Sequence, residues 1–128
     1  MTLPPAYGSG GAGGKDYSTD EQDSGQKWHD GRTIYQKTLT GTTGTGALDT
    51  IPHGITDYDV LIEHKGAIVR SAGTKQYCAL GSTEHPSVIG DNILITVDET
   101  NILFVFGASS SQWDTKAYHI TIFYVKVA

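Results

Sequence analysis

Residues 17–38, YSTDEQDSGQKWHDGRTIYQKT, carry the strongest local structure signals of this chain. Within this stretch, Asp30-Gly31 predicts a two-residue hairpin turn of type I′, which needs positive φ at both central residues. Residues 33–40 follow with β-branched and aromatic side chains, including Ile34 and Tyr35, and this composition is typical of a strand. We therefore expect a polar lead-in, a tight turn and a strand, with Trp28 packed over the hairpin.

The rest of the body also has the composition of strands. Short turns are expected at Lys65-Gly66 and at residues 98–101, so that neighbouring strands form hairpins. Strict alternation would place Val60 and His64 on one face of their strand and Leu61 on the other. The expected strands, the last two with weaker patterns, are 33–40, 59–64, 67–71, 93–97, 102–106, 117–127, 77–80 and 47–51.

The last strand differs from the others because it has apolar residues on both faces, with His119 and Thr121 beside Phe123 and Val125 on one of them. Tyr118, Ile120, Ile122 and Tyr124 share one face, and residues 119, 121, 123 and 125 share the other. A strand of this kind is expected in the centre of a sheet or at a subunit interface.

These patterns predict an all-β fold, an antiparallel β-sandwich or jelly-roll-like body with an extended glycine-rich N-terminal arm. No window of eleven or more residues has a helical period free of glycine, so no substantial helix is expected. Short strands separated by glycine-rich turns favour a sandwich. The body is assigned to residues 16–128 and the arm to residues 1–15, while residues 40–46 are expected to form a loop.

The arm has the composition of a linker, with six of its residues between positions 8 and 14 being glycine or serine. One interpretation is a disordered tail. The other is an anchor held by a partner surface or a neighbouring subunit, because such a segment cannot offset its ordering entropy alone. In that case the apolar contacts would be Leu3, Pro4, Pro5 and Tyr7.

The opening stretch also resembles a module of bacteriophage fibre and other virion surface proteins. The similarity lies in Y-S-T-x-E at residues 17–21, in W-x-D-G at 28–31, in I-Y-x-K-T at 34–38, and in a closing strand that ends before Lys126. Arg32-Thr33 stands where that family has Lys-Pro. The resemblance implies a virion structural role and a β-rich, usually trimeric module. Its structural motif residues would be Tyr17, Trp28, Asp30, Gly31, Ile34 and Tyr35.

Composition limits the possible functions. A chain of 128 residues has room for one domain, and its 38% hydrophobic content favours burial of further surface in an oligomer. The net charge of −5 and the lack of a basic stretch argue against nucleic-acid binding. The single cysteine, Cys78, is expected to be a small buried residue. No apolar run is long enough to insert in a membrane, and no secretory signal is visible, so a soluble protein made in a host cytoplasm is expected.

Catalytic patterns are absent from the sequence, and we expect no enzyme, no cofactor and no metal. The five histidines have no metal-binding spacing, although one per subunit could meet on a three-fold axis. Asp57-Tyr58-Asp59 and Asp91-Asn92 could offer oxygen atoms to calcium, but turn chemistry explains them better.

Trp113 is the best candidate for binding a host glycan. It lies between two strands in a polar segment, and Gln112 and Asp114 could orient sugar hydroxyls beside its ring. The alternative is that Trp113 folds back onto the end of the sandwich or packs against a neighbouring subunit.

Three functions are considered. The first is a trimeric fibre or tail-type surface module of a virion, anchored to capsid, tail or baseplate proteins by its arm and involved in host attachment. The second is a decoration or head-fibre protein with a mechanical role, which fits a short chain that starts at Met1 with only an arm before its body. The third is a cellular glycan-binding β-sandwich, which the motif disfavours.

Overall fold

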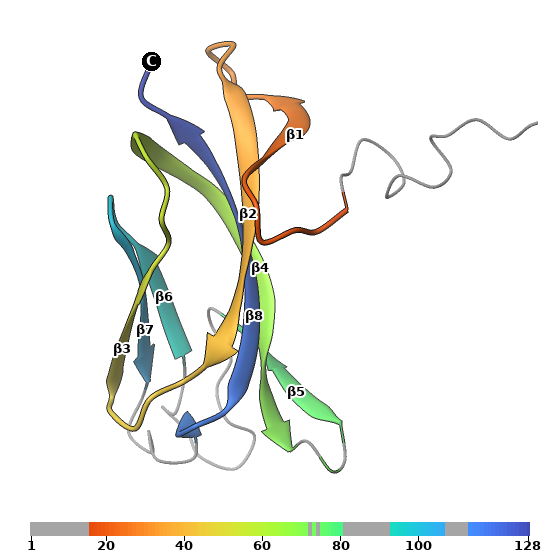
Figure 1. Ribbon diagram of the computed structural model, residues 1–128, viewed down its shortest axis with the longest axis vertical. Helices are drawn as coiled ribbons and strands as arrows, with labels where there is room; N and C mark the ends of the chain where they lie inside the picture. Colours follow the sequence, from red (N-terminus) through yellow and green to blue (C-terminus); the bar gives the residue numbers. More distant parts are fainter. Residues whose placement is uncertain (1–15, 72, 74, 81–92, 107–112) are drawn as a thin grey trace, which may run out of the picture.

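The computed structural model describes residues 16–71, 73, 75–80, 93–106 and 113–128. The described residues form two antiparallel sheets packed face to face (Figure 1). The five-stranded sheet has the order β1 (Gln22–Lys27), β2 (Thr33–Thr42), β8 (Ala117–Lys126), β4 (Tyr58–Ser71) and β5 (Gln76–Ala79). The three-stranded sheet has the order β3 (Leu48–Pro52), β7 (Asn101–Phe106) and β6 (Ile93–Val97).

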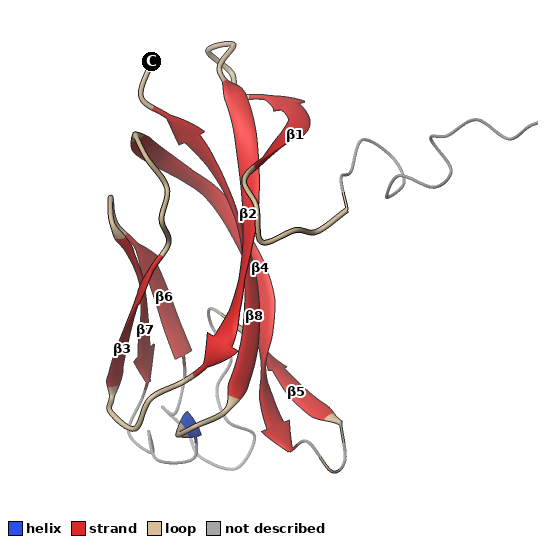
Figure 2. Ribbon diagram, viewed as in Figure 1, coloured by secondary structure: helices blue, strands red, loops and turns tan. Residues whose placement is uncertain are grey.

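This architecture confirms the predicted all-β sandwich. Figure 2 shows strands and loops throughout, and the only helical residue among those described is Trp113, in a 3₁₀ conformation. The proposed arm of residues 1–15, with Leu3, Pro4, Pro5 and Tyr7, lies outside the described residues. Cys78 lies in β5, but its side chain is not described.

The last strand is central, as its doubly apolar pattern predicted. β8 pairs with β2 on one side and with β4 on the other. Its residues Tyr118, Ile120, Ile122 and Tyr124 face the three-stranded sheet and are buried in the core. On the opposite face Val125 is buried and Phe123 is partly buried, whereas His119 is exposed. The central position of β8 thus agrees with the presence of apolar residues on both of its faces.

The turn predicted at Lys65-Gly66 is wrong, because β4 runs without interruption through these residues. Gly66 pairs with Ile120 of β8. A Cβ atom built on Gly66 would lie 2.1 Å from the backbone oxygen of His119 and 2.8 Å from the Cα of Ile120. Glycine is required here by the close approach of two backbones and not by a change of chain direction.

The predicted alternation along β4 is also wrong at one point. Leu61 pairs with Tyr124 and Glu63 with Phe123, so Ile62 has no residue opposite it and forms a β-bulge. The bulge brings Leu61 to the same face as His64, and Leu61 packs against the core. Burial lowers the pKa of His64, whose Nδ1 has no hydrogen-bond partner within the described part of the chain.

The Asp30-Gly31 hairpin is present, but its loop has three residues instead of two. The carbonyl of Trp28 accepts from the N–H of Gly31 at 2.9 Å, and the N–H of Trp28 donates to the carbonyl of Arg32 at 2.8 Å. Gly31 has a φ of 91°, whereas Asp30 is not among the residues with positive φ. The loop is therefore a turn closed by a left-handed glycine and not a type I′ turn.

Two other segments differ from the sequence prediction. The polar lead-in contains β1, which pairs with β2 although QDSGQK has no apolar side chain. The segment predicted as a loop at residues 40–46 begins as strand, because β2 extends to Thr42. The turn at residues 98–101 is confirmed, with the side chain of Asp98 accepting from the N–H groups of Thr100 and Asn101 at 2.9 and 2.6 Å.

Candidate functional site

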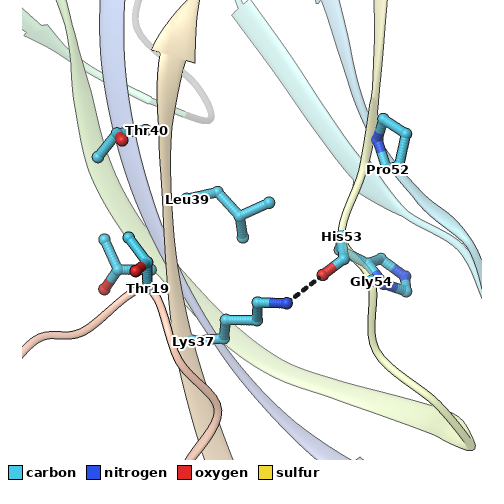
Figure 3. Close-up of a pocket in the computed structure, with 8 residues that line it drawn as sticks. Thr19, Lys37, Leu39, Thr40, Pro52, His53 and Gly54 are labelled. Atoms are coloured by element: carbon cyan, nitrogen blue, oxygen red, sulfur yellow. Dashed lines mark hydrogen bonds between the residues drawn. The ribbon is translucent and has the colours of Figure 1, made fainter.

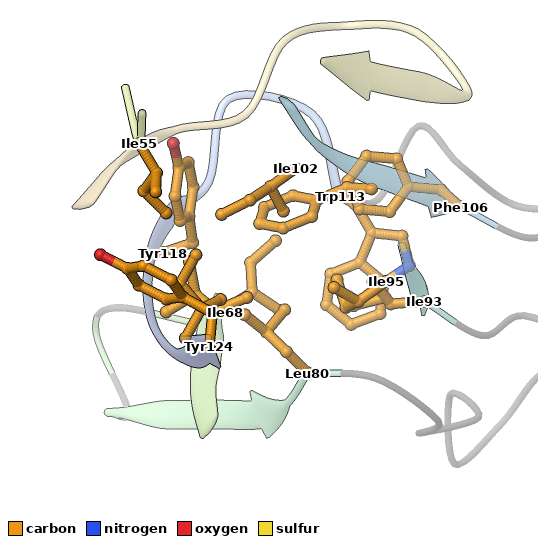
Figure 4. Close-up of a cluster of buried hydrophobic side chains, with 13 residues drawn as sticks. Ile55, Ile68, Leu80, Ile93, Ile95, Ile102, Phe106, Trp113, Tyr118 and Tyr124 are labelled. Atoms are coloured by element: carbon orange, nitrogen blue, oxygen red, sulfur yellow. The ribbon is translucent and has the colours of Figure 1, made fainter. Parts of the chain in front are cut away.

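The ring of Trp113 is not exposed at the surface, where it could stack on a sugar. Its side chain is 1% exposed and belongs to the core, where Figure 4 shows it beside Phe106, Ile93 and Ile95. The alternative interpretation, in which Trp113 folds onto the end of the sandwich, is the one that the structure supports. The hydroxyl of Thr43 donates to the carbonyl of Trp113 at 2.5 Å, which fixes this corner.

The two residues expected to assist Trp113 do not form a site with it. Gln112 lies outside the described residues. Asp114 is half-buried, and its Oδ1 atom has no partner among the residues that the structure describes. The exposure of Trp113 was predicted from the polarity of its sequence neighbours, but a single large apolar side chain gains more by filling the open end of the core.

The motif residues come together instead as a clasp between the first and last parts of the body. The carbonyl of Ser18 accepts from the N–H of Thr38 at 2.9 Å, which holds the N-terminal segment on β2. Glu21 then reaches the last strand, where its carboxylate binds the ammonium of Lys126 at 2.6 Å and accepts from the hydroxyl of Tyr124. Burial, followed by the hydrogen bond to Glu21, raises the pKa of Tyr124.

Aromatic rings complete this clasp. Tyr35 and Tyr124 are stacked with ring centroids 6.1 Å apart, and the ammonium of Lys126 lies 5.1 Å from the centroid of Tyr35. Glu21, Tyr35 and Lys126 are far apart in the chain, and the fold brings together the segment before β1, strand β2 and strand β8 at this point. Such contacts contribute about 0.5–1.5 kcal/mol per aromatic pair and about as much per cation–π pair.

Arg32 ties the hairpin to the neighbouring strands. Its guanidinium bonds the carboxylates of Asp30 and Asp59 at 2.8 and 2.7 Å and the carbonyl of Lys126 at 2.8 Å. The bonds to the carboxylates of Asp59 and Asp30 raise the pKa of Arg32, and the hydrogen bond from the backbone N–H of Arg32 lowers the pKa of Asp30. The use of Asp59 as an ion-pair partner, with Asp57 at a positive φ of 59°, fits turn and pairing chemistry better than calcium binding.

The remaining motif residues either pack against the body or lie at its surface. Ile34 is buried, and Trp28 is half-buried with its ring 4.9 Å from that of His29. Tyr17, by contrast, is 65% exposed. Most of the motif thus holds the fold, and Tyr17 is the member free to meet a ligand.

No family model, no curated protein and no solved structure matches this chain. Its possible functions must therefore be argued from its own residues. Among those described, no group of three or more His, Cys, Asp or Glu side chains is placed to hold a metal ion. Asp91-Asn92 and His85 lie outside the described residues. Within the same described part, no helix has the length and apolar character to span a bilayer.

Two hollows flank β2 at Thr38, the residue on which the N-terminal segment is held. The first lies between the sheets and has a volume of about 320 Å³. Figure 3 shows Lys37 crossing it toward His53, whose carbonyl accepts from the Lys37 ammonium at 2.7 Å. This bond connects β2 to the segment that follows β3 and engages the ammonium of Lys37, the charged group of the hollow, in a structural contact. The other lining residues are Thr19, Thr38, Leu39, Thr40, Pro52 and Gly54.

The second hollow lies on the outer face of the five-stranded sheet and has a volume of about 410 Å³. Its lining combines an exposed ring, hydroxyl groups, an imidazole and an ammonium group. Sequence reasoning missed it because the residues come from the N-terminal segment, β2, β4 and β8, which are far apart in the chain. They are Tyr17, Thr38, Lys65, Gly66, Ala67, His119 and Thr121.

Proposed function

We propose that this chain is a non-enzymatic structural protein of a bacteriophage virion, a homotrimeric surface module that its N-terminal arm anchors to other virion proteins. The clasp is the observation that carries this proposal. Ser18 and Glu21 bind the body at β2 and β8, so whatever precedes them leaves from a fixed point on the sandwich. If the arm binds a larger particle, force on the arm is transmitted to the core of the sandwich only when the arm is attached to the body at a fixed point.

The burial of Trp113 bears on the choice between host attachment and a mechanical role. The sequence offered Trp113 as the best candidate residue for host attachment, and this ring is buried. A decoration or head-fibre role needs no such ring and agrees with a motif that is used mainly to close the fold. The mechanical role is therefore preferred for the body, with assembly in the host cytoplasm and the virion as the final location.

Removing residues 1–14 is expected to leave the body folded and oligomeric while abolishing its incorporation into virus particles. The physical reason is that the clasp begins at Ser18 and keeps all of its partners in the truncated chain. The measurement is an immunoblot of purified particles from cells that produce either form, with circular dichroism of both purified proteins.

Two results would contradict the proposal in different ways. Equal incorporation of the truncated chain would show that the arm is not the anchor. Absence of the full-length chain from purified particles, when it is abundant in the lysate, would rule out a virion protein altogether.

The outer face of the three-stranded sheet supports the proposed trimer. Eight residues of β3, β6 and β7 point away from the core, and none of them carries a charge. Leu48 and Leu94 are both paired with Val105, so the three side chains form an apolar row across the sheet. Neutral faces of three copies can meet around a three-fold axis without like-charge repulsion, although the chain has a net charge of −5. The eight residues are Leu48, Thr50, Pro52, Leu94, Thr96, Asn101, Leu103 and Val105.

The substitution Val105→Lys is expected to convert a trimer to a monomer. Val105 is 37% exposed and lies in the middle of the row, so a lysine there leaves the core intact but places three like charges in the interface. Light scattering of the purified protein at micromolar concentration measures the mass. Val127→Lys is the matched control, because Val127 is an exposed apolar residue away from this face. A monomeric native chain, or a Val105→Lys trimer, would disprove this assignment.

A further inference from the structure

We propose that the hollow on the outer face of the five-stranded sheet is a binding site for a neutral saccharide residue. This proposal goes beyond a virion role and does not depend on it. It assigns to Tyr17 and its neighbours the ligand chemistry that the sequence suggested for Trp113.

The hollow exists because small side chains occupy its floor. Thr38 of β2, Thr121 of β8 and Lys65 of β4 lie in register, and the next row contains His119 and Ala67. Threonine and alanine on adjacent strands leave a depression that larger strand residues would fill, and Gly66 adds no side chain. The volume of about 410 Å³ lies within the usual range of about 300–1,000 Å³ for small-molecule sites.

The wall of the hollow is an aromatic ring held in place by the backbone. The carbonyl of Ser18 is bonded to the N–H of Thr38, which places the adjacent Tyr17 over the floor. The ring is 65% exposed although it lines the hollow, so a flat ligand can cover it. A sugar ring presents C–H groups to such a surface and hydroxyl groups at its edge, whereas a purely apolar ligand would leave the polar groups of the hollow unpaired.

The polar groups of the hollow are better suited to bind the hydroxyl groups of a neutral ligand than the charged groups of an ionic one. The hydroxyls of Thr38 and Thr121 bond one another at 2.7 Å. Thr121 is buried, so the hydroxyl of the partly exposed Thr38 is the one that can also bond a sugar hydroxyl. His119 is exposed at the rim and offers a ring nitrogen. The ammonium of Lys65 is already balanced, since it lies 3.5 Å from the carboxylate of Glu63 and 5.1 Å from the centroid of Phe123. The hollow thus has no unbalanced charge that would favour an anion.

Titration of the ¹⁵N-labelled full-length chain with glucose, galactose, N-acetylglucosamine and sialic acid tests the proposal. Amide shifts at Ala67, His119 and Thr121 are expected with at least one of the neutral sugars. Tyr17→Ala should weaken that binding roughly tenfold, because it removes the ring but no core contact. Ala67→Leu should abolish it by filling the floor while leaving Tyr17 unchanged.

Tyr77→Ala is the matched control, because Tyr77 is a 55% exposed tyrosine that does not line the hollow. It should bind as the native chain does. The proposal is overturned if none of the neutral sugars shifts these amides, if sialic acid is preferred, or if Tyr77→Ala weakens binding and Tyr17→Ala does not. Both tyrosine variants should still enter particles, so a loss of sugar binding can be told apart from a failure of the virion role.

Discussion

Replacing Gly66 with alanine is expected to lower the free energy of unfolding by more than about 3 kcal/mol, which is a large share of the stability of a small domain. The added methyl group would lie 2.1 Å from the backbone oxygen of His119, and backbone atoms cannot move aside as a flexible side chain can. Relief of the clash requires β4 and β8 to separate, and this pairing joins the centre of the five-stranded sheet. Urea denaturation followed by circular dichroism measures the loss.

Gly73→Ala provides the control for this substitution. A Cβ atom on Gly73 meets nothing within 4 Å, so the change in stability should stay within about 0.5 kcal/mol. Equal and small effects at both positions would mean that β4 and β8 do not approach closely at Gly66. They would also restore the turn that the sequence suggested there.

Trp113→Ala is expected to lower the free energy of unfolding by about 3–5 kcal/mol, the usual cost of removing a large buried aromatic side chain. The ring is 1% exposed and lies among Phe106, Ile93 and Ile95, so its loss leaves a cavity between the sheets (Figure 4). The free energy of unfolding is a property of the isolated protein, so it can be measured without host cells. Chemical denaturation of the purified variant is sufficient.

Two further variants make the Trp113 result specific. Trp113→Phe should recover part of the stability by refilling the cavity, and Tyr77→Ala should change little because Tyr77 is exposed. A fully stable Trp113→Ala protein that no longer adsorbs to host cells would instead return Trp113 to a receptor site. That outcome would contradict its place in the core.

The fold class and most of the strands could be predicted from the amino-acid sequence. Period-two patterns identified β6, β7 and β8 closely, because alternating burial on two packed sheets imposes that period directly. The central place of β8 followed from apolar residues on both of its faces. The turn at residues 98–101 followed from Asp98, whose side chain bonds the chain just ahead of it.

Several features were decided only by contacts between distant segments. β1 has no apolar side chain and forms because β2 offers it an edge. Gly66 is needed because β8 passes close by, which no neighbour of Gly66 in the chain can reveal. The bulge at Ile62 places Leu61 and His64 on the same face, since one extra residue reverses the alternation between the residues before it and those after it.

The candidate sites also combine features that the sequence shows with features that only the folded chain shows. The motif at residues 17–38 could be recognised in the chain, but the contact between Glu21 and Lys126 required the last strand to pair with β2. The sequence neighbours of Trp113 are polar, whereas its neighbours in the folded chain are apolar. Its burial is therefore visible only in the packed core. The hollow beside Tyr17 is made by small residues on three paired strands. Local pattern determines which face of a strand is apolar, whereas a site depends on register between strands, and register exists only in the folded sheet.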